Sequence, residues 1–168
     1  RNIRQINDLF CAISDAWETE NGQQLINTLI DTGNHFIKTR GKNTPAIGNA
    51  INYVLNGIND LPKKNVDNVR NFIHRKRDEY NRNSLNNIDK IANYGANLLI
   101  DCDSILAYDY SSSMLAVLSE ISRRGKHLHL IVPESRDLDG GRPIIKEATG
   151  MGHSVHFIID IAFHHFIR

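Results

Sequence analysis

Residues 104–132 read SILAYDYSSSMLAVLSEISRRGKHLHLIV, and this stretch decides the fold. Two short apolar runs, at 105–108 and 127–132, have the length of buried strands, and the apolar residues between them recur every three to four positions up to Gly125. This spacing predicts a strand, a helix that ends at Gly125, and a second strand. Two strands that are joined by a helix lie parallel in one sheet with a right-handed crossover.

The same alternation continues toward the carboxyl end of the chain. A Gly-Gly-Arg-Pro turn at residues 140–143 precedes a second helix, and residues 153–159 form a third apolar stretch. The pattern predicts a β-α-β-α-β arrangement with a parallel sheet, followed by the start of a further helix at residues 161–167. Three strands are few for such a sheet, so we expect the domain to be C-terminally incomplete in this chain.

The first hundred residues show a helical period instead. Every asparagine lies at or before Asn97, which favours helices with many ends over strands. Apolar spacing predicts three amphipathic helices, at residues 3–17, 25–30 and 47–55. One long or broken helix follows at residues 66–100, and its polar middle at 75–83 faces solvent. Thr44 and Pro45 provide a start signal for the third helix. The fold class is therefore α/β, with a helical domain at residues 1–100 and a Rossmann-like domain at 101–168.

Composition excludes several classes of function. The chain has 20 Lys+Arg and 19 Asp+Glu, a formal net charge of +1, so it lacks the strongly basic character of nucleic-acid-binding proteins. Cys11 and Cys102 form no CxxC pair, which argues against a disulfide framework and favours a reducing compartment. No apolar run is long enough to cross a bilayer, and the start has no signal-peptide core. We expect a cytoplasmic protein with no membrane partner and no direct nucleic-acid partner.

Ligands of parallel sheets bind beyond the carboxyl ends of the strands, where helix N-termini present free amides. After the first strand, three serines can hold a phosphate together with backbone amides, or one of them simply caps the helix: Ser111, Ser112 and Ser113. After the second strand, Arg136 can bind an anion while Glu134 accepts a hydroxyl or orients the arginine; alternatively, the two form an ion pair in a surface turn.

Other candidate sites are less specific. Asp160 follows the third strand and acts either in the ligand site or as a helix cap. In the helical part, Arg40 and Gly41 lie in the run TRGKNTP (residues 39–45), which is either an anion site or a solvated loop, since neither a P-loop nor a GxGxxG pattern is present. The histidines offer a metal alternative, with His127 and His129 on one strand face, but no Asp or Glu completes a spaced motif. We predict no metal and no cofactor, and two inert cysteines.

The order of these segments resembles a known family. ILAYDYSSS (105–113), IVPESR (131–136) followed by Gly141-Arg142, and IID (158–160) are similar to the superfamily of the regulatory subunits (alpha, beta and delta) of eukaryotic translation initiation factor 2B. That superfamily also includes the ribose-1,5-bisphosphate and methylthioribose-1-phosphate isomerases. Residues 39–51 also resemble its arginine motif in the helical domain, with a slightly different loop spacing. The similarity spans residues 36 to 161.

The resemblance implies a helical domain before a Rossmann-like domain, a phosphorylated sugar or nucleotide bound between them, and assembly through the C-terminal domain into homodimers or larger homo-oligomers. The isomerases use a cysteine after the first strand, in a Thr-His-Cys context, with a later aspartate as its partner. Here Asp109 stands at the position of the cysteine and Tyr108 at that of the histidine, and the expected position of the later aspartate lies beyond Arg168.

Three functions remain open from the sequence. The first is a regulatory or non-catalytic protein that binds the phosphorylated ligand without turning it over, because the cysteine is absent. The second is a sugar-phosphate isomerase, an intramolecular oxidoreductase, in which Asp109 is the acid/base; a carboxylate can move the proton if it is desolvated. The third is a structural assembly module without a small-molecule ligand. We rank them in that order, with the first two close together.

Overall fold

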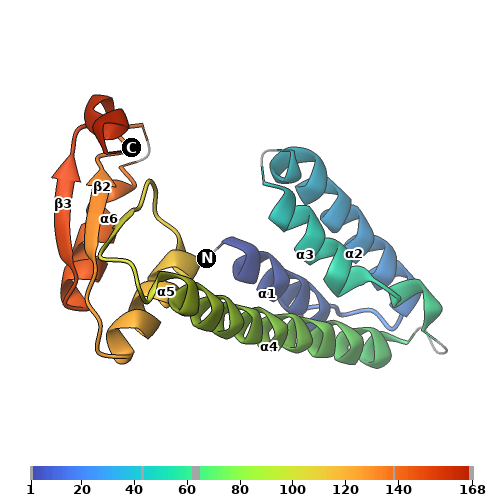
Figure 1. Cartoon of the computed structure of the whole chain (residues 1–168). Helices are drawn as coiled ribbons and strands as arrows, with labels where there is room; N and C mark the ends of the chain where they lie inside the picture. Colours follow the sequence, from blue (N-terminus) through green and yellow to red (C-terminus); the bar gives the residue numbers. More distant parts are fainter. Residues whose placement is uncertain (1, 43, 62–64, 138, 167–168) are drawn as a thin grey trace. The chain divides into compact units, whose positions relative to one another are not determined.

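The computed structural model describes residues 2–42, 44–61, 65–137 and 139–166 (Figure 1). The chain divides into two compact units, a first unit at Arg1–Ser84 and a second unit at Leu85–Arg168. The division lies within the long helix α4 (Val66–Leu99), whereas the sequence changes character near residue 100, where α4 ends. Among the described residues, no helix is both long and apolar enough to cross a membrane.

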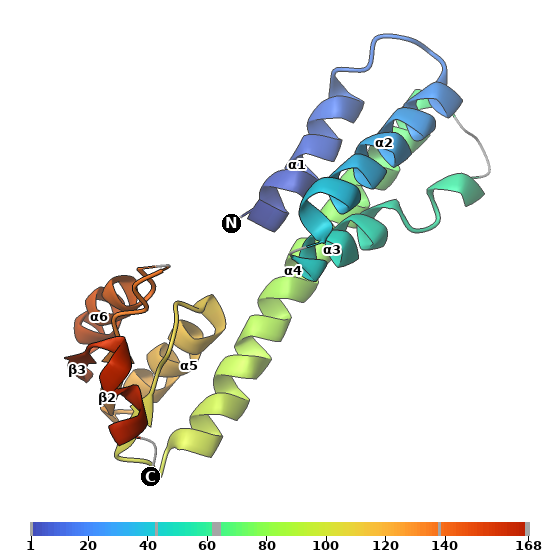
Figure 2. The same cartoon turned by 90° about the horizontal axis from the view of Figure 1, so that it is seen from above.

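The first unit is helical, as the spacing predicts. Its elements are α1 (Asn2–Asp15), α2 (Gly22–Phe36), the π-helical turn η1 (Ile37–Gly41), α3 (Pro45–Leu55), the short 3-10 helix η2 (Ile58–Asp60) and the first part of α4. Figure 2 shows α1, α2 and α3 gathered around that part of α4. They enclose a core of fully buried side chains, among them Phe10, Leu25, Ile26, Leu29, Ile51 and Ile73.

Helix α3 begins where the sequence predicts, but without the predicted capping hydrogen bond. Thr44 occupies the position before the helix and Pro45 the first turn, but the Thr44 side chain makes no capping hydrogen bond. At the start of α2 the capping bond is present, because the Asn21 side chain accepts from the Gln24 N–H at 3.0 Å. Asparagine thus serves at a helix end in this unit, as its bias toward the first hundred residues suggests.

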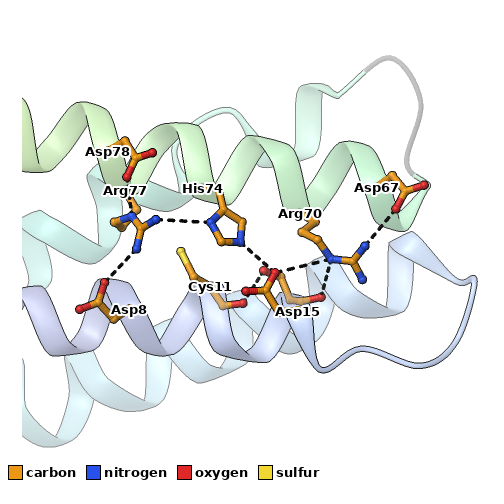
Figure 3. Close-up of polar contacts among 9 residues, drawn as sticks. Asp8, Cys11, Asp15, Asp67, Arg70, His74, Arg77 and Asp78 are labelled. Carbon is orange, nitrogen blue, oxygen red and sulfur yellow. Dashed lines mark hydrogen bonds and ion pairs between the residues drawn. The ribbon is translucent and has the colours of Figure 1, made fainter.

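A polar network joins α1 to α4 (Figure 3). Arg77 donates to Asp8 at 3.1 Å, His74 Nε2 lies 2.8 Å from the Asp15 carboxylate, and Arg70 donates to the Ser14 carbonyl at 3.2 Å. The expectation that residues 75–83 face solvent is therefore wrong for Arg77, whose side chain is only 24% exposed. Polar residues on this helix face pack against a neighbouring helix because α1 supplies two carboxylates and a backbone carbonyl as acceptors.

The second unit contains the parallel sheet. Its elements are the last part of α4, β1 (Ser104–Leu106), α5 (Ser112–Arg123), β2 (His129–Pro133), α6 (Gly141–Gly150), β3 (Ser154–Ile158) and the 3-10 helix η3 (Asp160–His165). The strands are parallel in the order β1-β2-β3, which confirms the β-α-β-α-β prediction. The predicted helix at 161–167 is instead the 3-10 helix η3, and Ile167 lies outside the described residues.

The sheet and its helices share one core. Leu130 in the central strand, Leu118 and Ile121 in α5, and Ile144 in α6 are fully buried. The end of α4 joins this core through Ala96, and Arg124 donates to Asn97 at 2.6 Å and to Asn93 at 3.1 Å. The carboxyl end of α5 is thereby joined to the end of α4 by hydrogen bonds.

Candidate functional site

The carboxyl ends of the three parallel strands lie on one edge of the sheet, and the predicted segments follow them. Residues 107–111 connect β1 to α5, residues 134–140 connect β2 to α6, and Asp160 comes shortly after β3. The structure therefore brings the second-unit candidates to one edge, where ligands of such sheets bind.

The loop after β1 ends in a capped helix. The Ser111 side chain accepts from the Met114 N–H at 3.4 Å, a long bond, so the capping alternative is observed. Ser111 and Ser112 are exposed and Ser113 is half-buried. The first turn of α5 leaves backbone N–H groups without partners inside the helix, and these groups favour an anion. The serine segment retains the donors that a phosphate needs.

Asp109 belongs to the loop after β1, and its carboxylate lies against Gly140 at the end of the loop after β2. Its carboxylate accepts the N–H of Tyr110 at 2.7 Å, and the residue is half-buried. A Cβ atom at Gly140 would overlap the Asp109 carboxylate, and one at Gly141 would overlap the Pro133 carbonyl oxygen. Gly140 thus permits a close approach of the loops after β1 and β2, and Gly141 permits the start of α6 to approach the end of β2.

The loop after β2 carries the anion candidate. Arg136 donates to Glu134 at 2.7 Å, so the two form the ion pair that the sequence left as an alternative, and the Arg136 side chain is 76% exposed. Asp160 accepts the backbone N–H of Ser135 at 2.8 Å and that of Arg136 at 3.0 Å. Sequence reasoning offered Asp160 as a ligand contact or a helix cap. Its bond to a neighbouring loop depends on tertiary structure, and no local signal reveals it.

A pocket of about 410 Å³ opens beside this loop. Its lining comes from the loop after β2 and from the residues that follow β3: Glu134, Arg136, Asp137, Ile159, Asp160 and Ile161. Three of these side chains are carboxylic acids and one is a guanidinium. The pocket therefore combines acceptors for hydroxyl groups with one strong donor for a phosphate or carboxylate.

Arg40 and Gly41 belong to the first unit. They lie in η1, a π-helical turn, a rare geometry that is frequent at functional sites. Arg40 has no ion-pair partner among the described residues. It lines a pocket of about 380 Å³ together with Gln5, Ile6, Leu9, Phe36 and Ile47. The sequence placed Arg40 in a loop, because π-helical turns have no recognisable residue signature.

The histidines have structural partners. His153 is buried: its Nδ1 accepts the Leu128 N–H at 3.0 Å and its Nε2 donates to the Leu118 carbonyl at 3.0 Å, which fixes the neutral Nε2–H tautomer. His129 Nδ1 lies 2.9 Å from the Ser154 hydroxyl. Within the described ranges, no three His, Cys, Asp or Glu side chains come together as a metal site.

The two cysteines differ in environment. Cys11 is buried in α1, and burial raises the pKa of its thiol, an effect only partly opposed by the charge of Arg77. Cys102 is half-buried. A buried thiol with a raised pKa is a poor nucleophile, which agrees with the prediction for Cys11.

A helical part followed by a part with three parallel strands, with loops gathered at the carboxyl edge of the sheet, defines an α/β protein with a Rossmann-like second part. The model of the Initiation factor 2 subunit family matches residues 1–168, and the chain belongs to this family. The resemblance noted from the sequence is thereby confirmed.

The curated relatives include ribose 1,5-bisphosphate isomerases. The protein of Methanocaldococcus jannaschii is 28% identical over 148 residues, which is 88% of this chain and 46% of the relative. The protein of Haloferax volcanii is 27% identical over 123 residues, or 73% of this chain and 37% of the relative. The chain thus spans less than half the length of these relatives.

Solved structures show the same fold. The translation initiation factor eIF-2B of Pyrococcus horikoshii OT3 has a TM-score of 0.80 at 19% identity, covering 98% of this chain and 55% of that one. The eIF2B beta structure from Chaetomium thermophilum has a TM-score of 0.67 at 18% identity, covering 98% and 54%. At these identities the likeness supports the fold alone.

Proposed function

We propose that this protein binds a phosphorylated sugar or nucleotide at the carboxyl edge of its sheet and regulates through that ligand without converting it. The observation that carries the proposal is Asp109. It stands where the isomerases resemble one another in having a cysteine, it is half-buried, and its carboxylate accepts the backbone N–H of Tyr110. This carboxylate replaces the thiol on which the isomerases rely, and the replacement supports binding of the ligand without turnover.

The donors at this edge suit a phosphate. The first turn of α5 presents free amides beside exposed serines, and Arg136 supplies a guanidinium at the neighbouring loop. Glu134 can accept a sugar hydroxyl. Arg40, in the first unit, lines a pocket of that unit and is a separate candidate for anion binding. We further propose that the protein works in the cytoplasm and forms homodimers or larger homo-oligomers through the second unit.

A second candidate is a sugar-phosphate isomerase with Asp109 as acid/base. It is favoured by the relatives that are named ribose 1,5-bisphosphate isomerase, one of which matches 88% of this chain. Under this alternative the substrate is a pentose bisphosphate.

Thermal unfolding of the full chain tests the proposal. Pentose phosphates, pentose bisphosphates and purine nucleotides are each added at millimolar concentration, because only a ligand that prefers the native state raises the melting temperature. We expect one class to stabilise the protein and Arg136→Ala to abolish the effect, whereas Lys146→Ala, at an exposed position on α6, leaves it unchanged. If no compound changes the melting temperature, the result would favour an assembly module without a ligand.

A turnover assay separates the two ligand-binding candidates. The stabilising compound is incubated with the wild-type chain and with Asp109→Asn, and isomerised product is measured. Binding without product supports the regulatory proposal. Turnover that disappears in Asp109→Asn would replace it with the isomerase.

A further inference from the structure

The bond between Asp160 and the loop after β2 has an unusual form. Both carboxylate oxygens are used, Oδ1 by the N–H of Ser135 and Oδ2 by the N–H of Arg136. Two successive amides that converge on one anion are a typical anion-binding arrangement. Here the anion is a side chain of the protein itself, supplied shortly after the neighbouring strand.

The loop needs this support. Ser135 has a φ of +48°, in the left-handed region that favours glycine, and it is 6% exposed. Such a backbone conformation costs free energy for a residue with a side chain and persists only where its surroundings impose it. The backbone bond from Glu134 to Ile158, at 2.9 Å, holds the start of the loop, whereas the bond from Gly141 to Glu134 is long, at 3.4 Å. The Asp160 carboxylate is therefore the main anchor at Ser135 and Arg136.

We propose that Asp160 is a positioning residue, which holds the loop after β2 in the conformation that presents Arg136 to the ligand pocket. The Arg136 amide is bonded to Asp160 while its guanidinium lines the pocket, so the carboxylate orders the residue whose side chain binds the ligand. Because the two amides already donate to Asp160, a phosphate at this loop binds the guanidinium of Arg136 and not these backbone N–H groups. That Arg136 is presented to a ligand rests on the proposed function, whereas the ordering of Ser135 and Arg136 by Asp160 does not.

The first test needs no ligand. Amide hydrogen exchange of Ser135 and Arg136 is measured by NMR in the full chain, in Asp160→Ala and in Asp137→Ala. Asp137→Ala is the control, because Asp137 lines the same pocket and its carboxylate has no described bond to these amides. We expect exchange at both amides to become at least about tenfold faster in Asp160→Ala and to stay unchanged in Asp137→Ala, since a charge-assisted hydrogen bond is lost only in the first. Equal exchange in all three proteins would overturn the inference.

The second test uses ribose 1,5-bisphosphate as the probe and calorimetry as the readout. We expect Asp160→Ala to weaken binding about tenfold, as loss of a charged hydrogen bond predicts. Asp101→Ala, at an exposed residue near the amino end of β1, should leave affinity unchanged. Adding Ser135→Gly to Asp160→Ala should restore much of the affinity, because glycine adopts the left-handed conformation without the cost.

The rescue separates positioning from direct contact. If Asp160 touched the ligand itself, glycine at residue 135 would restore nothing, and the inference would be overturned. If the wild-type chain binds neither this probe nor any compound of the thermal-unfolding panel, the proposed function fails, and the amide-exchange result alone decides whether Asp160 orders the loop.

Discussion

The carboxylate of Asp109 occupies the space that any side chain at Gly140 would need. Gly140 has ordinary helical backbone angles, with φ −73° and ψ −23°, so the constraint is steric and not conformational. The loops after β1 and β2 therefore meet at a contact that only glycine permits.

Gly140→Ala should destabilise the protein. We expect the free energy of unfolding to fall by about 1–3 kcal/mol, because the added methyl group must displace the Asp109 carboxylate or the loop. Gly150→Ala is the matched control, since a Cβ at this other end of α6 meets nothing within 4 Å. Urea denaturation measures both. An Asp109→Ala, Gly140→Ala double variant should recover part of the loss, and equal stability of the two single variants would contradict the steric argument.

His153→Ala should cost about 2–6 kcal/mol of unfolding free energy, because two buried polar groups lose their partner and each costs about 1–3 kcal/mol. The two groups are the Leu128 N–H and the Leu118 carbonyl. His153→Asn retains an acceptor in place of Nδ1 and should lie between the wild type and His153→Ala. His164→Ala, at an exposed residue, is expected to change stability by less than about 0.5 kcal/mol. Chemical denaturation at neutral pH is the measurement.

The two thiols should react at different rates with a disulfide reagent. Cys11 is 4% exposed and burial raises its pKa, whereas Cys102 is half-buried. We expect Cys102 to react first and Cys11 to react at least about tenfold more slowly until the chain unfolds. The single variants Cys11→Ala and Cys102→Ala assign the two phases. A rapid reaction in Cys102→Ala would show that α1 opens readily.

Glu120 should make stability depend on acid pH. Hydrogen bonds from Arg123 and Arg124 lower the pKa of this carboxyl from 4.5 to about 2. A lowered pKa in the folded state gives a stabilisation that is complete above pH 4.5 and is lost as the pH falls toward 2. The difference in urea midpoint between wild type and Glu120→Gln should therefore shrink from pH 6 to pH 3. Glu147→Gln, at an exposed residue of α6 with no described ion pair, is the control, and a difference that stays constant with pH for Glu120→Gln would contradict the assignment.

Periodicity predicted the elements well because it reflects local burial. The apolar spacing around Met114–Ile121 and the runs at 105–108 and 127–132 identified α5, β1 and β2, and the glycine at 125 marked the helix end. The capping role of Ser111 was also readable, since caps involve neighbouring residues.

The contacts that shape the candidate site were not readable in this way. Asp160 bonds to amides 24 and 25 residues earlier, and His153 joins groups 25 and 35 residues away. Arg77 looks like a solvated charge until α1 is placed beside it. Each of these contacts depends on how separate elements pack, so residue spacing along the chain does not predict it.

The strand order β1-β2-β3 also affects how the protein behaves in concentrated solution. Within the described residues only β2 has a neighbouring strand on both sides, so β1 and β3 each leave one row of main-chain groups without a strand partner. Such edges are where chains add strands and aggregate. The three residues of β1 offer a short edge, whereas β3 has five residues and an exposed Phe157, so heat-stressed samples of the chain of 168 residues should self-associate first along β3.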